Sequence, residues 1–399
     1  MPNLELASID VAKHLGINSL GEYITKQRVT HDLSFPGIKS KESINSRMDK
    51  SKLEPVMFCH YLLRLIHQIV SLRKRHPNKK IWIRKEDLKS AYRRLHLRAS
   101  SALKSAVRVK MNKISYIILS LRFTFGGTSG PADFCLFSDI LCDTINDLLA
   151  CKPWDEKQIC SDFIKNIPPA ENMNNNIPFA KASELSVDIP IEDTGKFDVY
   201  IDDFIGIKVD IANNKSRLEV APCTVIQKVS NNPTSENHIP RDNMIEIDKC
   251  IAEGAIGEER ICIGWILNTR KLLVKLPEHK CKAWITDLKN FIKRISVNHN
   301  DLKSLIGKLE NVIIITKMQS HFMNNVYALE MKSSETKHNI KVTRNARKDA
   351  ELHIHFLEKA RLGININVLT FRKPTYTTIG DACEHVLGAF NVKTGIVWT

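Results

Sequence analysis

A pair of adjacent carboxylates inside an apolar segment constrains this chain more than any other feature of its sequence. Asp202 and Asp203 lie between two runs of apolar residues, which are Phe197, Val199 and Ile201 before the pair and Phe204, Ile205 and Ile207 after it. This pattern predicts a strand, a turn and a second strand over 197–209, with the carboxylates at the turn. A solvated surface turn is the alternative. However, carboxylates held in a buried hairpin are costly unless they bind a metal ion.

Two further segments carry residues suited to the same chemistry. Asp87 follows the apolar run Ile81-Trp82-Ile83, which predicts a short buried strand that ends at the carboxylate. The segment Phe123–Ala132 combines a Gly126-Gly127 turn with a predicted helix start, in which Ser129 is the N-cap and Pro131 lies in the first turn. Mg²⁺ prefers hard oxygen ligands, and two such ions about 4 Å apart can activate a hydroxyl and stabilise a leaving pyrophosphate. Asp87 and Asp202, supported by Asp203, would supply such ligands.

The remaining elements follow from hydrophobic periodicity. We expect a helix over 56–75, two strands within 107–125 with a turn near Asn112, and a strand pair over 261–276. Two helices are expected next, one carrying Trp284 and Phe291 on one face and one starting near Asn300-Asp301. Residues 1–52 show little periodicity, and 151–195 and 231–243 are polar and predict loops.

Composition limits the class of protein. The 399 residues carry a net charge of +15, with 43% hydrophobic residues, which is typical of a folded protein with an anionic partner such as nucleic acid. No apolar run reaches the roughly 18 residues that a membrane span needs, and the N-terminus lacks the layout of a secretory signal. The ten cysteines form no short-spaced pairs, which favours reduced thiols over structural zinc. We therefore expect an intracellular protein, either cytoplasmic or nuclear, with no membrane partner.

Positive charge is concentrated before and around Asp87. Between Ser71 and Arg98 there are eleven Lys or Arg against Glu86 and Asp87, a net charge of +9. Such a cluster suits a channel for a nucleic-acid backbone. A solvated helix end explains the basic residues of 73–80 equally well. Arg93 and Arg94, close to the predicted carboxylate site, favour the nucleic-acid interpretation.

The three acidic and glycine-rich segments together resemble the palm of a retroelement reverse transcriptase of the gypsy- or DIRS-like LTR type. Asp87–Tyr92 resembles its motif A, Phe123–Phe134 its motif B, and Tyr200-Ile201-Asp202-Asp203 its motif C, in the order of the family. Ile263-Gly264-Trp265 stands where the family has its primer-grip hairpin, and Leu302–Leu309 resembles its thumb or connection helix. The similarity spans Arg28–Leu309 and is specific in the three motifs.

The resemblance implies an α+β fold, a right-hand polymerase of fingers, palm and thumb with an antiparallel palm sheet. We expect partial fingers and a preceding helix in 1–80, and a palm in 81–276 with insertions at 151–195 and 210–260. Thumb or connection helices would occupy 277–370. The end of the chain, 371–399, resembles the opening hairpin of an RNase H domain, with Asp381 on its first strand. One carboxylate cannot make a nuclease, so we expect a truncated RNase H start and a chain that is part of a larger Pol polyprotein.

Roles carried over by position define the expected site. Asp87, Asp202 and Asp203 would be the catalytic residues and the ligands of two Mg²⁺ ions, with Mn²⁺ as a possible replacement. Tyr92 would be the steric gate that excludes a 2′-hydroxyl and so selects dNTPs, and a buried packing tyrosine is the alternative. The other implied substrate contacts are the backbone of Leu88 and Lys89, the Phe125-Gly126 turn, and Arg28, for which a surface arginine is the alternative. The implied nucleic-acid contacts are Arg93, Arg94, Gly264 and Trp265.

These expectations lead to RNA-directed DNA polymerase activity, in which dNTPs are added to a primer 3′-hydroxyl on an RNA template. Two alternatives remain open. A decayed retroelement fragment would bind nucleic acid without catalysis. A viral-type RNA-dependent RNA polymerase would incorporate rNTPs, and Tyr92 speaks against it because that class usually has an aspartate at this position.

Overall fold

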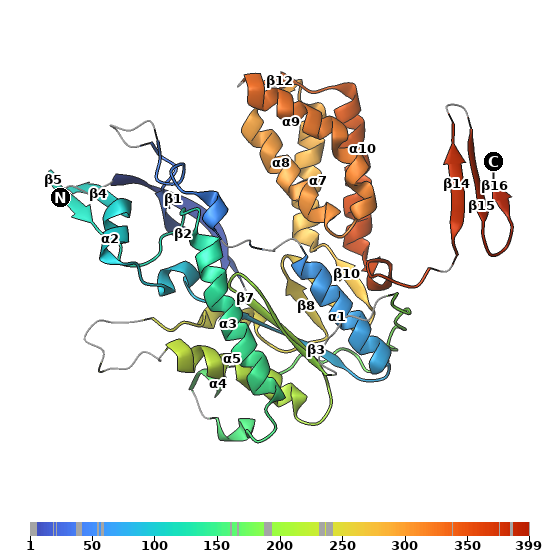
Figure 1. The fold of residues 1–399 in the computed structure, drawn as a ribbon, viewed down its shortest axis with the longest axis horizontal. Coiled ribbons are helices and arrows are strands. Elements are labelled where there is room, and N and C mark those ends of the chain that lie inside the picture. The colour runs from blue at the N-terminus through green and yellow to red at the C-terminus, as the bar shows by residue number, and fades with distance from the viewer. Residues whose placement is uncertain are drawn as a thin grey trace. The chain divides into compact units, whose positions relative to one another are not determined.

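The chain folds into two compact units of mixed α and β structure with mainly antiparallel sheets, seen in the computed structural model in Figure 1. Unit 1 comprises Met1–Leu65, Lys79–Pro178 and Glu192–Arg270, and unit 2 comprises Ile66–Asn78, Phe179–Ile191 and Lys271–Thr399. The structure describes residues 6–18, 20, 22–36, 42–53, 56, 60–159, 162–165, 167–186, 194–230, 236, 242–336, 338–374, 376–383 and 386–398. The expected α+β class is confirmed.

A three-stranded antiparallel sheet forms the centre of unit 1. Its strand order is β3 (Ile81–Asp87), β7 (Asp203–Val209) and β6 (Gly195–Tyr200). The helices α3 (Gly130–Ala150) and α5 (Asn214–Ser230) pack against each other and against these strands. Their shared core includes side chains with almost no exposed surface, namely Trp82, Phe134, Phe197, Phe204 and Leu218. Burial of these large apolar groups fixes the sheet beneath the helices.

The elements that carry the three sequence segments lie where the apolar pattern predicts them. The strand ending at Asp87, the strand–turn–strand over 197–209 and the helix after Ser129 are all confirmed. One detail is wrong. Ser129 occupies the N-cap position, but its side chain accepts no capping hydrogen bond, because its backbone is already helical (φ −77°, ψ −16°).

A second sheet of unit 1 has the order β2 (Tyr23–Asp32), β1 (Leu6–Ile17), β4 (Ala106–Met111) and β5 (Ile114–Ile118). The β4–β5 hairpin confirms the turn expected near Asn112. The β1–β2 hairpin was not expected, because residues 1–52 lack an alternating apolar pattern. It is held by a long backbone register from Ser8↔Asp32 to Ile17↔Tyr23, which leaves little trace in the sequence.

A helix and a hairpin complete the surroundings of the central sheet. The helix α6 (Ile247–Glu253) follows the outer edge of β3, and β8 (Glu259–Cys262) pairs antiparallel with β9 (Trp265–Asn268). This hairpin confirms the first part of the strand pair predicted over 261–276. The other short elements of this unit are α2 (Ala99–Ala102), α4 (Asp162–Lys165) and the 3-10 turns Lys50–Lys52, Ala91–Arg94, Leu103–Ser105 and Glu156–Gln158.

Unit 2 is dominated by packed helices. These are α7 (Glu278–Lys293), α8 (His299–Ile313), α9 (Asn324–Thr336) and α10 (Arg344–Leu362). The first two confirm the predicted helices, and Asn298 caps α8 by accepting a hydrogen bond from the Asp301 N–H. The division between the units falls within α1 (Tyr61–Arg75), which begins later than the predicted helix start at 56.

Short strands make up the rest of unit 2. Antiparallel pairs join β11 (Ser296–Val297) to β12 (Ile340–Lys341) and β10 (Leu273–Lys275) to β13 (Ile364–Asn365). The strands β14 (Thr378–Ala382), β15 (Leu387–Asn391) and β16 (Val397–Trp398) form an antiparallel sheet that includes the strand of Asp381. Two 3-10 segments, Lys317–Met323 and Ile366–Val368, connect these elements.

Within the described part of the chain, no helix is both long enough and apolar enough to cross a membrane. The described cysteines are free thiols: Cys135, Cys142, Cys151, Cys223, Cys250, Cys262, Cys281 and Cys383. The other two cysteines of the sequence, at positions 59 and 160, lie outside the described residues, so the prediction of reduced thiols is not tested there.

Candidate active site

Two of the three predicted carboxylates face each other across neighbouring strands. Asp87 is the last residue of β3, and Asp203, the first residue of β7, is its direct partner in the antiparallel register. Side chains paired in this way have Cβ atoms about 4.5–5.5 Å apart, and like charges at such positions are destabilising. Asp202 precedes Asp203 in the two-residue turn from β6, in which Tyr200 pairs with Asp203. The fold therefore brings all three carboxylates to one end of the sheet.

The turn that carries Asp202 has an unusual backbone. Ile201 has a left-handed φ of 58°, a region that β-branched residues rarely occupy. In two-residue hairpin turns a left-handed first position is usually occupied by glycine, asparagine or aspartate. The isoleucine side chain is retained there by packing against the apolar core of unit 1. Backbone strain of this kind costs about 1–3 kcal/mol and is concentrated at functional sites.

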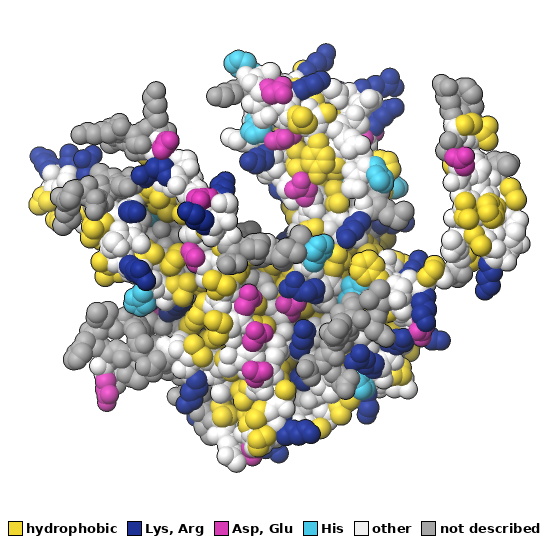
Figure 2. Space-filling view, in the orientation of Figure 1, with side chains coloured by type: hydrophobic (Ala, Val, Ile, Leu, Met, Phe, Trp, Pro, Cys, Tyr) yellow, Lys and Arg dark blue, Asp and Glu magenta, His cyan; other side chains and the backbone are white. Residues whose placement is uncertain are grey.

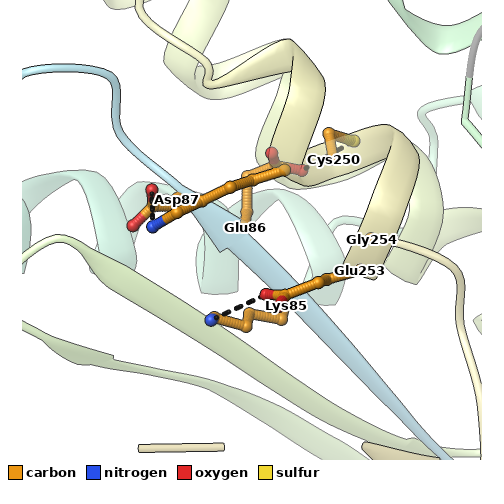
Figure 3. Close-up of a pocket in the computed structure, with 7 residues that line it drawn as sticks. Lys85, Glu86, Asp87, Cys250, Glu253 and Gly254 are labelled. Carbon is orange, nitrogen blue, oxygen red and sulfur yellow. Dashed lines mark hydrogen bonds and ion pairs between the residues drawn. The ribbon is translucent and has the colours of Figure 1, made fainter. Parts of the chain in front are cut away.

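Lysine side chains approach two of the carboxylates, and Figure 3 draws the part of this arrangement around Asp87, Lys85 and Glu253. The Lys249 ammonium, from α6, donates a hydrogen bond of 2.6 Å to Asp87 Oδ2. Lys85 lies on β3, two residues before Asp87, and its Nζ is 3.6 Å from Asp203 Oδ1 and 3.3 Å from Glu253 Oε2. A small pocket lies beside Asp87. It is lined by Lys85, Glu86, Asp87, Lys249, Cys250, Glu253 and Gly254.

The charges at this end of the sheet alter the protonation of its members. Burial and the negative charge of Asp203 raise the pKa of Asp87 to about 7, with a further upward contribution from Asp202, although Lys249 opposes the rise. Burial lowers the pKa of Lys85, but the charges of Asp203 and Glu253 outweigh burial and hold this pKa above its ordinary value. The pKa of Lys249 is raised in the same way, with Asp87 overcoming the effect of burial. The site thus has more negative charge than its lysines neutralise.

The donor set has the chemistry that Mg²⁺ requires. Carboxylate oxygens from Asp87, Asp202 and Asp203 are hard ligands, and crowding of like charge raises the affinity for a cation. Among the described residues, no group of three or more His, Cys, Asp or Glu side chains is already arranged to hold a metal ion. Mg²⁺ is commonly bound through one or two carboxylates plus water and substrate phosphates. The oxygen donors therefore suit Mg²⁺ chemically, and an ion held here would also need water or substrate phosphates as ligands.

Aromatic residues from the segments 87–92 and 123–134 meet within electrostatic reach of Asp202. The Tyr92 ring contacts Phe125 edge-on, with centroids 5.2 Å apart, and lies 5.2 Å from Phe134. Burial and the charge of Asp202 raise the pKa of Tyr92 to about 12. Tyr92 is half-buried, so part of its ring packs against these neighbours and part is exposed.

The glycine turn next to Phe125 is tightly fixed. Gly126 has φ +108°, and a Cβ there would lie 2.0 Å from the His31 carbonyl oxygen. Asn45 fixes the turn from the side, because its Nδ2 donates to the Gly126 carbonyl at 2.8 Å and its Oδ1 accepts from the Thr128 N–H at 3.0 Å. Only glycine fits this position. Asn45 was missed by the sequence analysis, since an isolated asparagine in a polar segment carries no signal.

Several predicted contact residues have other partners. The Lys89 N–H donates to the Met244 carbonyl at 2.8 Å, so it is not available to a triphosphate in this arrangement. Leu88 is buried and forms a bridge with Ile245. Arg94 donates to the carbonyls of Lys89, Asp242 and Asn243 at 2.7, 3.0 and 2.5 Å. These hydrogen bonds make Arg94 a clamp between two backbone segments.

The other predicted contact residues differ in accessibility. Arg93 is exposed, and its guanidinium lies 5.8 Å from the centroid of the Phe125 ring. Gly264 lies in the β8–β9 turn, whereas the Trp265 side chain has no exposed surface and belongs to the core. A nucleic-acid contact in this turn would therefore come from Gly264. Arg28 is on β2 opposite Ala12, and its side chain lies outside the described part of the chain.

The basic residues between 71 and 98 do not all face one channel. Arg73 and Arg84 are buried, Lys85 is paired with acidic groups, and Arg94 binds carbonyls. Figure 2 shows Lys and Arg side chains spread over the visible surface of each unit, while acidic side chains gather in the middle of unit 1. The net charge of +9 counted along the sequence is therefore an overestimate of the charge presented to a partner.

Comparisons with known proteins assign no family. No family model matches the chain, and no curated protein matches it. Solved structures do match. One is the foamy viral protease-reverse transcriptase in complex with double-stranded DNA, at 12% identity and a TM-score of 0.45, covering 97% of this chain. This chain spans 50% of the length of that chain. A likeness at this level does not establish a shared fold or activity, so the site must be interpreted from its own geometry.

The most informative residue that the sequence analysis missed is Lys249. It is 162 positions from Asp87, within a segment interpreted only as an insertion. A lysine inside an insertion has no pattern that would connect it to a distant carboxylate. The contact follows from the path of the backbone along the edge of β3.

Proposed function

We propose that this chain is an RNA-directed DNA polymerase of a retrotransposon, a gypsy- or DIRS-like reverse transcriptase. The observation that carries the proposal is the direct pairing of Asp87 with Asp203 at the end of the central sheet, with Asp202 in the adjoining turn. Opposed carboxylates destabilise a sheet unless positive charge offsets them, either from side chains such as Lys249 and Lys85 or from a bound cation. The Tyr92–Phe125 contact is within electrostatic reach of Asp202 and would supply a surface for a nucleotide next to that cation.

The proposed reaction adds a dNTP to a primer 3′-hydroxyl. Asp87, Asp202 and Asp203 would hold two Mg²⁺ ions, or Mn²⁺ in their place, and when bound these ions supply Lewis-acid stabilisation of the attacking and leaving oxygens. The carboxylates must be ionised to act as ligands, so Asp87, with its pKa near 7, has to lose its proton before or during cation binding. The proton that leaves Asp87 passes to solvent, since the carboxyl group retains some exposed surface.

We propose that Tyr92 selects the sugar of the incoming nucleotide. Its ring is fixed between Phe125 and Phe134, so it cannot easily turn away to accommodate a 2′-hydroxyl. A fixed aromatic wall favours dNTPs over rNTPs. Gly126 and Arg93, next to the same aromatic group, would contact the incoming nucleotide and the template backbone, respectively.

The larger architecture belongs to the same proposal. In it, the central sheet of unit 1 is the palm, the β1–β2–β4–β5 sheet belongs to the fingers, and the helices of unit 2 form the thumb or connection. The sheet β14–β15–β16 would be the start of an RNase H domain, and the chain would be part of a larger Pol polyprotein. RNA template, DNA primer and dNTPs are the proposed partners.

Primer extension tests the proposal. Purified protein with a primed RNA template, Mg²⁺ and dNTPs is expected to lengthen the primer, and rNTPs are expected to be poor substrates. Asp202→Asn should remove the activity, and Tyr92→Val should raise rNTP use relative to dNTP use. The proposal is wrong if no extension occurs across a range of Mg²⁺, Mn²⁺ and salt concentrations.

A second candidate function is nucleic-acid binding without catalysis. The contacts of Lys249 with Asp87 and of Lys85 with Asp203 favour it, because both carboxylates are then used in internal ion pairs. It predicts salt-sensitive binding of primer–template with no extension, and Asp202→Asn would leave the affinity unchanged. Filter binding and primer extension on the same preparation separate the two functions.

A further inference from the structure

The position of α6 is fixed by the edge of β3 on both sides. Before the helix, Ile245 bridges to Leu88, with hydrogen bonds from Lys89 N–H to the Met244 carbonyl (2.8 Å) and from Glu246 N–H to the Asp87 carbonyl (3.1 Å). After the helix, Gly257 bridges to Ile83 through bonds of 2.8 and 3.2 Å. The helix therefore spans the part of β3 that ends at Asp87, and neither end of it is free to move away.

Side chains add anchors between these two bridges. Arg84, which has no exposed surface, donates to Glu86 Oε2 at 2.7 Å and to the Gly254 carbonyl at the end of α6. Lys85 pairs with Glu253 in the last turn of α6. A buried arginine with a carboxylate partner and a backbone partner is strongly held in place. The Lys249 backbone is consequently positioned with little freedom next to Asp87.

The Lys249 ammonium is hydrogen-bonded to the Asp87 carboxylate oxygen that a metal ion would need as a ligand. Its ammonium is 2.6 Å from Asp87 Oδ2, and the carboxylate side chain is only 12% exposed. The lysine side chain is 37% exposed, so its ammonium can rotate into solvent while α6 stays in place. A cation at Oδ2 and an ammonium at hydrogen-bond distance from the same oxygen repel each other strongly in a partly buried site.

We propose that Lys249 is an internal counter-ion of Asp87 that a divalent cation must displace, so that this lysine sets the cation affinity of the site. The inference rests on the proposed function, because it takes Asp87 to be a cation ligand. In the absence of a cation, Lys249 neutralises part of the charge that Asp87 and Asp203 place at the sheet end. When a cation binds, the ammonium moves to solvent and the carboxylate oxygen becomes a ligand. Lys249 is thus a positioning residue that acts through Asp87.

Direct Mn²⁺ binding tests the inference without any polymerase assay. Full-length protein, free of nucleotide and at one fixed pH, is titrated with Mn²⁺ and the free ion is measured by electron paramagnetic resonance. Lys249→Met is expected to tighten Mn²⁺ binding by about tenfold or more, since one nearby positive charge is removed. Lys249→Gln, a second neutral variant, should behave in the same way. Lys249→Arg keeps the charge and should bind Mn²⁺ with nearly the wild-type affinity.

A matched control removes a lysine from an ion pair elsewhere. Lys282 pairs with Glu278 on the exposed surface of α7, and Lys282→Met is expected to leave Mn²⁺ affinity unchanged. Adding Asp87→Asn to Lys249→Met should abolish the gain, because the two residues act on the same oxygen. Equal Mn²⁺ affinity in the wild type and both neutral Lys249 variants, with binding still lost in Asp202→Asn, would overturn the inference and leave the proposed function intact. Absence of Mn²⁺ binding that depends on Asp87 or Asp202 in every variant would also overturn the inference, and primer extension tests the proposed function separately.

Discussion

Two hairpins of unit 1 have the same turn length and a left-handed isoleucine as the first turn residue, but the second turn residue is an aspartate in one and a glycine in the other. The β6–β7 turn is Ile201-Asp202 and the β8–β9 turn is Ile263-Gly264, and both isoleucines are left-handed, with φ of 58° and 48°. In the second turn Gly264 is also left-handed, with φ 79°, as a type I′ turn requires. Asp202 does not adopt this conformation.

The two hairpins differ in whether packing and turn geometry account for their turn residues. The β8–β9 turn is flanked by Cys262 and Trp265, both buried, so its sequence is explained by packing and turn geometry. The β6–β7 turn is followed by Asp203, which faces Asp87. Neither turn geometry nor packing requires two adjacent carboxylates there. Turn geometry and packing therefore explain the sequence of the second hairpin but not the two adjacent carboxylates of the first.

Asp202→Gly gives the first turn the Ile-Gly sequence of the second and has the largest expected effect. Primer extension should fall about 10³-fold or more, the order seen when one member of a catalytic group is removed. The free energy of unfolding should fall by no more than about 0.5 kcal/mol, because no packed side chain is lost. Single-turnover extension and urea unfolding measure the two quantities. Asp210→Asn, just beyond the other end of β7, is the control and should leave both unchanged.

Asp87→Asn should change the pH dependence of stability in metal-free buffer. Folding raises the pKa of Asp87 from its usual 3.8 to about 7, so the folded state retains a proton that the unfolded state loses. The wild type therefore loses stability as pH rises from about 4 to about 7, and the variant lacks this loss. The Tm of the variant should exceed that of the wild type increasingly over this range, by roughly 2–4 °C for each kcal/mol. If the Tm values of the wild type and the variant change with pH in parallel between about pH 4 and pH 7, the carboxylates do not oppose each other as described.

Gly264→Ala tests the second hairpin as a purely structural element. Alanine at φ 79° is strained, so the free energy of unfolding should fall by about 1–2 kcal/mol. Denaturant unfolding gives this value directly. Extension activity per folded molecule should change much less than in Asp202→Gly. A loss of activity as large as that of Asp202→Gly, without a loss of stability, would contradict the assignment of this turn to folding.

The smallest effect is expected from replacing the left-handed isoleucines by asparagine, which tolerates this conformation better. Ile263→Asn creates an Asn-Gly turn and should raise the free energy of unfolding by about 0.5–1 kcal/mol. Ile201→Asn should lower it instead, because the Ile201 side chain packs against the core of unit 1. Equilibrium unfolding of both variants side by side checks the contrast. The same sign for both would mean that the two turns do not differ in packing.

The sequence predicted the central sheet and its carboxylates because apolar runs around Asp87 and Asp202 mark buried strands. It did not predict the β1–β2 hairpin, whose register is held by backbone hydrogen bonds that any residue can make. The pairing of Asp87 with Asp203 also could not be derived from spacing alone, since register depends on how separate strands align.

The roles of basic residues were the least predictable part of the site. Arg94 looks in sequence like a nucleic-acid contact, yet its partners are backbone carbonyls, which carry no sequence signal. Lys249 looks like an unremarkable residue of an insertion, yet it lies 2.6 Å from a predicted catalytic oxygen. The role of a long charged side chain depends on which groups the folded backbone places within its reach.

Single-nucleotide incorporation tests most directly whether the paired carboxylates form a polymerase site. Wild-type protein and Asp203→Asn are given the same primed RNA template, one dNTP and Mg²⁺, and the extended primer is measured over time. We predict extension by the wild type and a rate that is reduced by at least about 10³-fold in the variant. Both proteins should be folded and should bind the primer–template. Equal extension by the two proteins, or none by the wild type while it binds the primer–template, would contradict the account.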